Sequence, residues 1–314
     1  MWGRVFGNLE MKAIKTVLVT GGAGFIGSHL TEALLSRGYL VRVLDNLTQG
    51  RADWLASHPN LEFRRGDICD LQTCIDACKD MHAVFHLAAM SKVAPSLENE
   101  SMLDFCTTQN VLGTLNLLKA AHRSQARKFI YSASSTAYGR TPPPHREASP
   151  PDCLNPYALT KYLGEQYCEL YDKLYGLPTL SLRYFQVYGP RQPSSGNYAV
   201  VTGIFLEQRK SGTPLTIHGD GSQKRDFVYV GDVAEANIRV LESPVHGTVI
   251  NVGTGTSHSI KEIADLISAD QMVGMPRRPG DMDETRADTS RCRSLLQWCP
   301  STPLVPTLLG LVGF

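Results

Sequence analysis

The chain has 314 residues, of which 42% are hydrophobic and 19% are charged, a composition that excludes an intrinsically disordered protein. Its 31 basic and 30 acidic residues leave a net charge of +1, which argues against a surface that binds nucleic acid or another polyanion. No stretch approaches the roughly 18 apolar residues of a membrane span, residues 1–15 contain no apolar signal sequence, and the eight cysteines form no paired framework. We therefore expect a cytoplasmic protein with reduced thiols, no membrane contact and a small-molecule partner.

Short β-branched runs alternate with helical patterns along the first half of the chain, which is typical of a parallel sheet covered by helices. The predicted strands are residues 16–20, 39–45, 61–65, 83–87, 128–132 and 179–184. The predicted helices are residues 25–37, 102–122 and 156–174. After residue 187 the alternation weakens, and residues 249–252 predict one last strand of the same sheet.

A glycine-rich turn, GGAGFIG at residues 21–27, lies between the first predicted strand and the first predicted helix. Gly21 permits a tight turn, Gly24 lets backbone N–H groups approach a pyrophosphate at the helix N-terminus, and Gly27 lets the helix pack closely on the strand. Three glycines alone would also fit an ordinary turn, but this position favours a dinucleotide site. The fold class we predict is α/β, with a Rossmann-type doubly wound parallel sheet.

The acid at the end of the second predicted strand indicates which dinucleotide binds. Asp45, followed by Asn46, is placed to accept hydrogen bonds from the adenosine ribose hydroxyls and to repel a 2′-phosphate, so NAD is favoured over NADP. Arg42 and Arg51 lie nearby in the sequence and keep NADP as an alternative. A simpler role for Asp45 would be to cap the following turn.

Three further residues predict a catalytic site. Tyr157 and Lys161 are four residues apart near the start of a predicted helix and therefore lie on one face. A phenol has a pKa of about 10, and a nearby ammonium together with a positive nicotinamide ring would lower it. Ser134 follows the fifth predicted strand at the carboxyl edge of the sheet, where its hydroxyl could bridge a substrate oxygen and Tyr157. Tyrosine and lysine alone would fit any amphipathic helix, so the order of all the motifs carries the prediction.

The motifs resemble those of the extended short-chain dehydrogenases/reductases of the nucleotide-sugar epimerase/dehydratase family, and most of all UDP-glucose and UDP-N-acetylglucosamine 4-epimerases. The similarity spans nearly the whole chain in the family's order. The matching segments are TGGAGFIGSH (20–29), GDICD (66–70), HLAA (86–89), NVLGT (110–114), YSASSTAYG (131–139), NPYALTK (155–161), LRYFQVYGPR (182–191), GDGSQKRDFVYVGDVA (219–234), NVGTG (251–255) and RPGD (278–281).

The resemblance implies bound NAD, a UDP-sugar substrate and a site without a metal. The cofactor-binding residues it implies are Gly21, Gly24, Phe25, Ile26, Gly27, Asp45, Asn46, Asp67, Ile68, Leu87, Ala88, Ala89, Asn110, Tyr157, Lys161 and Phe185. The substrate-binding residues it implies are Ser134, Gln186, Asn197, Tyr198, Ala199, Val200, Thr216, Ile217, His218, Arg225, Arg278 and Thr285, with the two arginines at the diphosphate. The catalytic residues it implies are Ser134, Tyr157 and Lys161.

The pattern along the chain predicts a domain organisation, and the resemblance implies an assembly. We expect an N-terminal extension at residues 1–15, an NAD-binding domain at 16–186 to which a strand at 249–253 returns, and a smaller nucleotide-sugar-binding lobe at 187–314. We also expect a homodimer that forms through the long helices near 102–122 and 156–174.

The residues that follow Ser134 distinguish between reactions. Related dehydratases and decarboxylases carry acids there, whereas this chain has Ser135 and Thr136, as the epimerases do. The implied reaction is 4-epimerisation: Tyr157 takes the proton of the C4 hydroxyl while hydride passes to NAD, and hydride then returns to the other face of the sugar. Other epimerases or dehydratases of the family remain alternatives, and so does a non-enzymatic NAD sensor.

One position bears on the choice of sugar. In proteins that resemble this chain, the residue five positions after the glycine of the RPGD-type motif guards sugar C2, and a tyrosine there restricts the site to plain hexoses. That residue is Thr285, so we expect UDP-N-acetylhexoses to be accepted beside UDP-glucose and UDP-galactose. Gln186 replaces the family's asparagine, and Asp283 and Glu284 add charge that could turn Thr285 away from the sugar.

Overall fold

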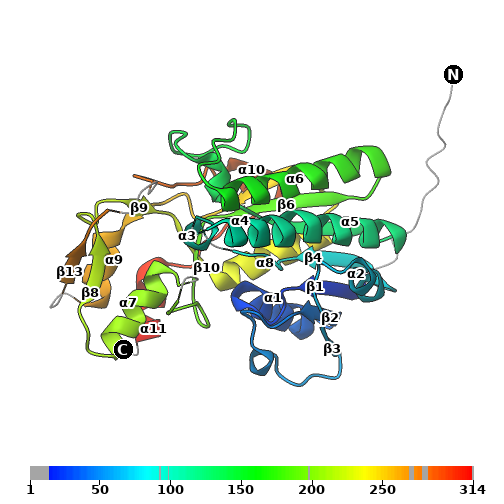
Figure 1. The fold of residues 1–314 in the computed structure, drawn as a ribbon, viewed down its shortest axis with the longest axis horizontal. Helices are drawn as coiled ribbons and strands as arrows, with labels where there is room; N and C mark the ends of the chain where they lie inside the picture. Colours follow the sequence, from blue (N-terminus) through cyan, green and yellow to red (C-terminus); the bar gives the residue numbers. More distant parts are fainter. Residues whose placement is uncertain are drawn as a thin grey trace.

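The computed structural model describes residues 14–91, 93–97, 99–196, 199–268, 272–277 and 282–312. Its centre is a seven-stranded sheet in the order β11-β6-β5-β4-β1-β2-β3, in which all neighbours are parallel (Figure 1). The doubly wound parallel sheet predicted from the sequence is therefore confirmed. The strands are β1 (Thr16–Thr20), β2 (Leu40–Asp45), β3 (Leu61–Arg65), β4 (Ala83–His86), β5 (Lys128–Ser134), β6 (Thr179–Tyr184) and β11 (Thr248–Val252).

Helices cover both faces of this sheet because successive strand residues point to opposite sides. Val17 and Val19 of β1 join a core that contains α1 (Phe25–Ser36) and α8 (Val230–Glu242). Leu18, between them, joins a second core on the opposite face. That second core contains α2 (Leu71–Cys78), α5 (Gly113–Arg123) and α6 (Pro156–Tyr175).

Helix α6, which carries Tyr157 and Lys161, begins and ends at residues whose local chemistry favours a helix boundary. The side chain of Asn155 caps its N-terminus by accepting a hydrogen bond from the Ala158 backbone, and Pro156 occupies the first turn. Gly176 ends the helix in the left-handed conformation, with φ of 67°. The helix therefore extends one residue past the predicted end at 174, to Tyr175.

The predicted helix at 102–122 is interrupted in the structure. It consists of α4 (Glu100–Thr107), a π-helical turn (η2, Thr108–Leu112) and α5. A side chain at Gly113 would collide with Ile68, since an added Cβ would lie 2.5 Å from the Ile68 Cδ1 atom. Periodicity cannot reveal a π turn of this kind, which shifts the helix register and is frequent near functional sites.

A smaller α/β region follows the main sheet and lies beyond its end in Figure 1. Its apolar core contains Phe205, Leu215, Ile217, Ile263 and Leu308. Its elements are α7 (Val201–Lys210), α9 (Ile260–Ile267), α11 (Leu304–Val312), and the paired strands β8 (Leu215–His218) with β13 (Met272–Met275), β9 (Lys224–Arg225) with β12 (His258–Ser259), and β7 (Gln186–Tyr188) with β10 (Phe227–Tyr229).

The main core extends past the predicted boundary at residue 187. Both α8 and α10 (Ser290–Leu296) contribute buried residues to the core around β1, although they come from the second half of the chain. The domain division at 187 itself remains a prediction. Short elements complete the description: η1 (Ala52–Trp54), α3 (Val93–Ser96) and η3 (Ser135–Tyr138).

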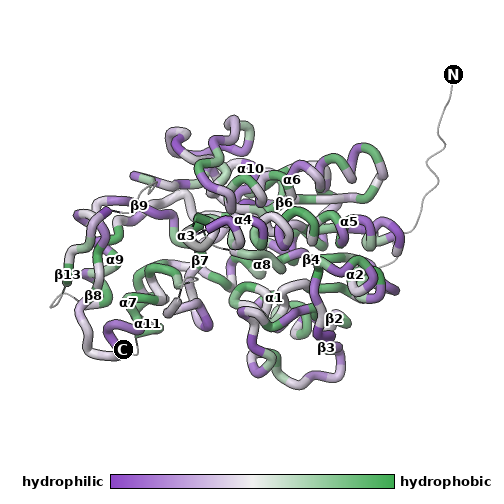
Figure 2. Tube along the Cα trace, in the orientation of Figure 1, coloured by the Kyte–Doolittle hydropathy of each residue, from purple (hydrophilic) through white to green (hydrophobic). Residues whose placement is uncertain are grey.

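Hydropathy follows this layering. Hydrophobic and hydrophilic stretches alternate along α5 and α6 in Figure 2, as expected for helices that pack one face on a sheet. None of the helices in the described ranges is long and apolar enough to cross a membrane.

Candidate active site

A cavity of about 1250 Å³ opens at the carboxyl ends of the central strands and continues into the smaller region. Open α/β sheets bind their ligands at this edge. The sequence-predicted residues that line it are Gly21, Gly24, Phe25, Ile26, Gly27, Asp45, Asn46, Ile68, Leu87, Ala88, Ala89, Ser134, Tyr157, Lys161, Phe185, Gln186, Ala199, Val200, Thr216, His218, Arg225 and Thr285.

Three predicted residues do not line the cavity, but each bonds to, or is adjacent in the chain to, a residue that lines it. The Asp67 carboxylate accepts a hydrogen bond from Asn46 Nδ2 at 3.0 Å. The buried Asn110 holds the Met90 backbone, with its Oδ1 2.8 Å from the Met90 nitrogen. Ile217 points into the apolar core of the smaller region. Asn197, Tyr198 and Arg278 fall outside the described residues.

The glycine loop is packed so closely that side chains could not replace its hydrogens. Gly21 has φ of +68°, and a Cβ there would lie 2.7 Å from the Ala88 nitrogen. A Cβ on Gly27 would overlap the Gly21 carbonyl oxygen. Gly24 begins α1 without a side-chain cap, so the first N–H groups of the helix, at Phe25 and Ile26, are left for a ligand. This cradle, with the positive end of α1, fits the pyrophosphate of a dinucleotide.

Asp45 is fixed at the end of β2 by the glycine loop. Its Oδ2 accepts a hydrogen bond from the Ala23 backbone at 3.0 Å, and its Oδ1 accepts one from Leu47 at 2.8 Å. Burial raises the pKa of Asp45, and these two backbone bonds oppose the rise. Each oxygen keeps acceptor capacity for a ribose hydroxyl.

The arginines that kept NADP as an alternative are engaged elsewhere. Arg42 pairs with Glu62 at 2.7 Å, and Arg51 pairs with Asp53 at 2.7 Å. Neither arginine lines the cavity. The carboxylate of Asp45 lines the cavity at the end of β2, and a carboxylate there favours NAD over NADP.

Ser134, Tyr157 and Lys161 meet at the carboxyl end of β5. The Ser134 Oγ accepts hydrogen bonds from the Thr136 backbone at 3.2 Å and from the Thr136 hydroxyl at 2.9 Å. Because these two bonds use the Ser134 oxygen as an acceptor, the Ser134 hydroxyl proton remains available for donation. A hydrogen bond between Ser134 and Tyr157 acts to lower the pKa of Tyr157. Lys161 is buried one helical turn beyond Tyr157, with its ammonium 4.4 Å from the centre of the Tyr131 ring.

Burial dominates the titration of this cluster. It raises the pKa of Tyr157 despite the bond to Ser134, and it lowers the pKa of Lys161 to about 7. The lowering of the Tyr157 pKa that the sequence led us to expect is therefore not achieved by the protein's own groups. A dry environment disfavours the phenolate and the ammonium alike, which sequence spacing cannot show.

Arg191 also lines the cavity, although we did not predict it as a site residue. It donates to the Ser28 hydroxyl at 3.1 Å and pairs with Glu32, so its guanidinium is held against α1. Its position as the last residue of LRYFQVYGPR was the available signal. A fixed cation beside a helix N-terminus suits a diphosphate.

Charge is distributed unevenly along the cavity wall. Among the described lining residues Asp45 is the single carboxylate, and it lies at the end of β2 beside the glycine loop. Ser135 and Thr136 line the wall beside Ser134, where a dehydratase would need an acid. No cluster of three or more histidine, cysteine, aspartate or glutamate residues that could hold a metal was found in the part of the chain described.

Comparisons with known proteins identify the relatives of this chain. The model of the NAD dependent epimerase/dehydratase family matches residues 17–253. The UDP-glucose 4-epimerase of Mycolicibacterium smegmatis is 38% identical, covering 95% of this chain and 97% of that protein.

Two solved structures share the fold over nearly their whole length. UDP-N-acetylglucosamine 4-epimerase from Methanobrevibacter ruminantium, in complex with UDP-N-acetylmuramic acid, has a TM-score of 0.90 at 36% identity, covering 96% of this chain and 98% of its own. Thermus thermophilus UDP-glucose 4-epimerase in complex with NAD has a TM-score of 0.86 at 36% identity, covering 95% and 97%. The resemblance of the motifs is thus confirmed: the chain belongs to the NAD-dependent epimerase/dehydratase family, and its cofactor is NAD.

Proposed function

We propose that this protein is a UDP-hexose 4-epimerase. One observation carries the proposal: Ser134, Tyr157 and Lys161 converge on the cavity, and the lining residues directly after Ser134, where a dehydratase needs an acid, are the hydroxyl-bearing Ser135 and Thr136. Bound NAD would supply a hydride acceptor and donor, so that the sugar is oxidised at C4 and reduced again from its other face.

The residues of the chain would divide the remaining work. Asp45 would hold the adenosine ribose, and the N–H groups at the start of α1 would hold the pyrophosphate. Tyr157 would take the proton from the C4 hydroxyl and give it back. Ser134, whose rotamer is fixed by Thr136, would donate to the phenolate or to the sugar oxygen. Lys161 would stabilise the phenolate whenever it carries its charge.

The position of Thr285 supports acceptance of N-acetylated sugars. Thr285 lines the cavity, and its backbone donates to the Lys224 carbonyl at 3.0 Å. The two acids before it are occupied elsewhere: Asp283 pairs with Arg277, and the Glu284 carboxylate accepts from Ser257 at 2.8 Å. These contacts argue against the alternative in which the acids turn Thr285 away from the sugar.

The direct experiment is an NMR assay of sugar configuration. The NAD-loaded protein is incubated separately with UDP-glucose, UDP-galactose, UDP-GlcNAc and UDP-GalNAc, and the C4 configuration is followed to equilibrium. We expect inversion at C4 for both pairs, a rate roughly 10²–10⁴-fold lower with Tyr157→Phe, and no product that has lost water. If none of the four sugars is inverted, or a dehydrated product appears, the proposal is wrong.

The exposed face of α4 and α6 supports the proposed homodimer. Five exposed leucines lie on these two helices, which pack against each other along the outer face of the molecule (Figure 1). An apolar face of this kind suits isologous packing on a second copy. The five residues are Leu103, Leu159, Leu163, Leu170 and Leu174.

A further inference from the structure

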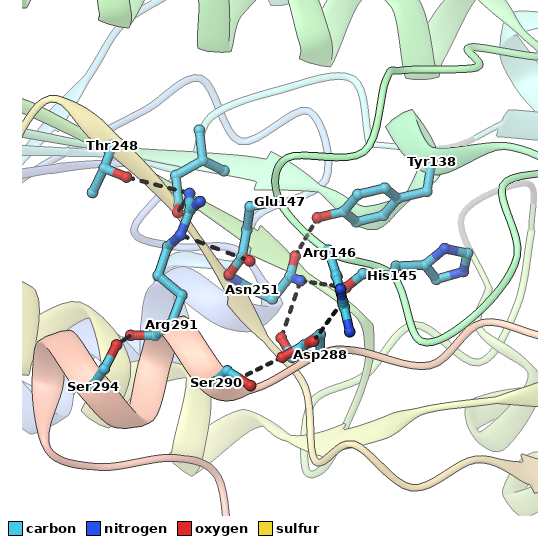
Figure 3. Close-up of polar contacts among 11 residues, drawn as sticks. Tyr138, His145, Arg146, Glu147, Thr248, Asn251, Asp288, Ser290, Arg291 and Ser294 are labelled. Carbon is cyan, nitrogen blue, oxygen red and sulfur yellow. Dashed lines mark hydrogen bonds and ion pairs between the residues drawn. The ribbon is translucent and has the colours of Figure 1, made fainter.

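The segment that joins Ser134 to Tyr157 is anchored on the far side of the main sheet's last strand. After η3 the chain runs through residues 139–155 before it enters α6. The middle of this segment packs on β11 and on residues 286–291 (Figure 3). Residues 286–291 follow Thr285 directly in the chain. The catalytic end and the sugar end of the cavity therefore share one anchoring point outside the cavity.

Asn251, in β11, is the centre of this anchoring point (Figure 3). Its Nδ2 donates to the His145 carbonyl at 2.9 Å and to the Asp288 carbonyl at 3.2 Å. Its Oδ1 accepts from the Tyr138 hydroxyl at 2.6 Å, and its backbone N–H donates to Glu147 Oε1 at 2.9 Å. The residue is fully buried, so an unmade bond could not be replaced by water.

His145 extends the connection by pairing with residues 286–288, which follow Thr285 in the chain. Its backbone donates to the Arg286 carbonyl at 2.7 Å, and its carbonyl accepts from the Asp288 backbone at 2.9 Å. Its ring stacks on Tyr138, with centroids 4.8 Å apart and planes 9° apart. Moving either segment would therefore disturb the other through His145.

Tyr138 links the same point to the catalytic helix. The Arg183 guanidinium lies 4.7 Å from the centre of the Tyr138 ring. Arg183 in turn forms two buried hydrogen bonds to Glu165 of α6, at 2.6 and 2.9 Å. Glu165 lies one turn beyond Lys161 on that helix. The contacts form an unbroken path from α6 through Tyr138 and Asn251 to residues 286–288, the segment that follows Thr285.

We propose that Asn251 is a positioning residue that sets the distance between Thr285 and Ser134 and thereby the enzyme's discrimination at sugar C2. Asn251 does not line the cavity, so it would touch neither NAD nor the UDP-sugar. The inference rests on the proposed function. A side chain that joins three separate segments through all of its polar atoms fixes their relative placement more strictly than a pairwise contact does.

The test compares two buried asparagines that donate to two backbone carbonyls each. Asn251→Asp keeps the size of the side chain and an acceptor for Tyr138, but it turns an oxygen toward the carbonyls of His145 and Asp288. Asn116→Asp makes the same change in α5, where Nδ2 donates to the Ile68 and Cys69 carbonyls at 3.1 and 3.0 Å, near the adenosine end. The readout is the ratio of kcat/KM for UDP-GlcNAc to kcat/KM for UDP-glucose, with Tm and NAD content measured alongside.

We expect Asn251→Asp to change that ratio at least fivefold. Asn116→Asp should leave the ratio within twofold of the wild type, even if its Tm falls as much as that of Asn251→Asp. Tyr138→Phe, which removes one bond of the set, should shift the ratio in the same direction by a smaller factor, and it serves as the test if Asn251→Asp does not fold. A ratio within twofold of the wild type in the folded variants would overturn the inference.

The outcome can be separated from a failure of the proposed function. If the wild type inverts none of the sugars, the proposed function fails, and the coupling is then measured by amide hydrogen exchange. Asn251→Asp, or Tyr138→Phe in its place, should accelerate exchange in residues 139–147 and 285–291 together, while exchange in α2 stays unchanged. Acceleration in one segment only, or in neither, would also overturn the inference.

Discussion

The two ends of the cavity are built in different ways. The cofactor end comes largely from consecutive β-α units, and its contacts are mainly backbone hydrogen bonds such as those from Ala23 and Leu47 to Asp45. The sugar end gathers Ser134, Gln186, Arg225 and Thr285 from distant parts of the chain. Under the proposed function, local geometry would therefore fix how the cofactor is held, whereas long-range packing would decide which sugar fits.

The largest effect on turnover should come from Tyr157, which lies between the two ends of the cavity. Tyr157→Phe removes one hydroxyl and leaves the glycine loop intact, so NAD should remain bound while turnover falls by roughly 10²–10⁴-fold, the usual contribution of a general base. Steady-state rates and the NAD content of the purified variant measure this. Turnover within a few-fold of the wild type would remove Tyr157 from the mechanism.

A block at the sugar end should separate substrates without affecting the cofactor. Thr285→Tyr should reduce kcat/KM for the N-acetylated sugars by more than the roughly 10–200-fold cost of a missing methylene contact, because the ring fills space instead of vacating it. UDP-glucose should still be converted. Thr285→Ser, the matched control, should accept both kinds of sugar. Equal losses for both kinds in the tyrosine variant would place the specificity gate elsewhere.

A change at the cofactor end should have the opposite signature. Asp45→Ala removes a charged acceptor, a type of hydrogen bond worth about 1.5–3 kcal/mol, so NAD should bind roughly 10–100-fold more weakly. Preference between the two sugars should not change. Asp45→Asn keeps one of the two acceptor oxygens and removes the charge, so it should also lose the discrimination against NADP. Titration of both cofactors checks this, and unchanged NADP rejection in both variants would contradict the role of the carboxylate.

The pH dependence should report the charge of Lys161. A nearby positive charge favours the phenolate, so its removal raises the pKa of Tyr157 further. The rising limb of kcat, which reflects formation of the phenolate, should therefore move to higher pH in Lys161→Met. Lys173→Met, on the exposed side of the same helix, is the control and should leave the limb in place. A limb that does not move in Lys161→Met would show that the lysine acts only in binding.

The smallest effect on chemistry should come from the outer face of α4 and α6. Leu159→Glu with Leu163→Glu would place charges in the proposed dimer interface, and burial of one leucine is worth about 1.5–3 kcal/mol. Sedimentation velocity should show a monomer for this variant. Leu40→Glu, at an exposed leucine on β2, should remain a dimer like the wild type. A monomeric wild type at micromolar concentration would disprove the dimer.

Sequence reasoning succeeded best where a local pattern determines the structure. β1, β3 and β6 have the bounds predicted from the sequence, and the glycine loop adopts the turn that its spacing required. Strand period and glycine stereochemistry are properties of a few neighbouring residues, so one sequence is enough to predict them.

The remaining features depend on contacts between distant residues. The π turn at Thr108–Leu112 has no periodic signature, and Arg191 reaches the cavity only because Glu32 holds it against α1. Among the protein's own groups, burial outweighs the expected lowering of the Tyr157 pKa, because the sequence shows spacing and charge but not the loss of water around a group.

The central claim is that hydride leaves C4 and returns to the same carbon from the other side. The most direct test uses UDP-glucose labelled with deuterium at C4 and the NAD-loaded protein in ordinary water. The UDP-galactose formed should keep the deuterium at C4, because the hydride is never exchanged with solvent. Product with hydrogen from water at C4, or inversion at another carbon, would contradict it.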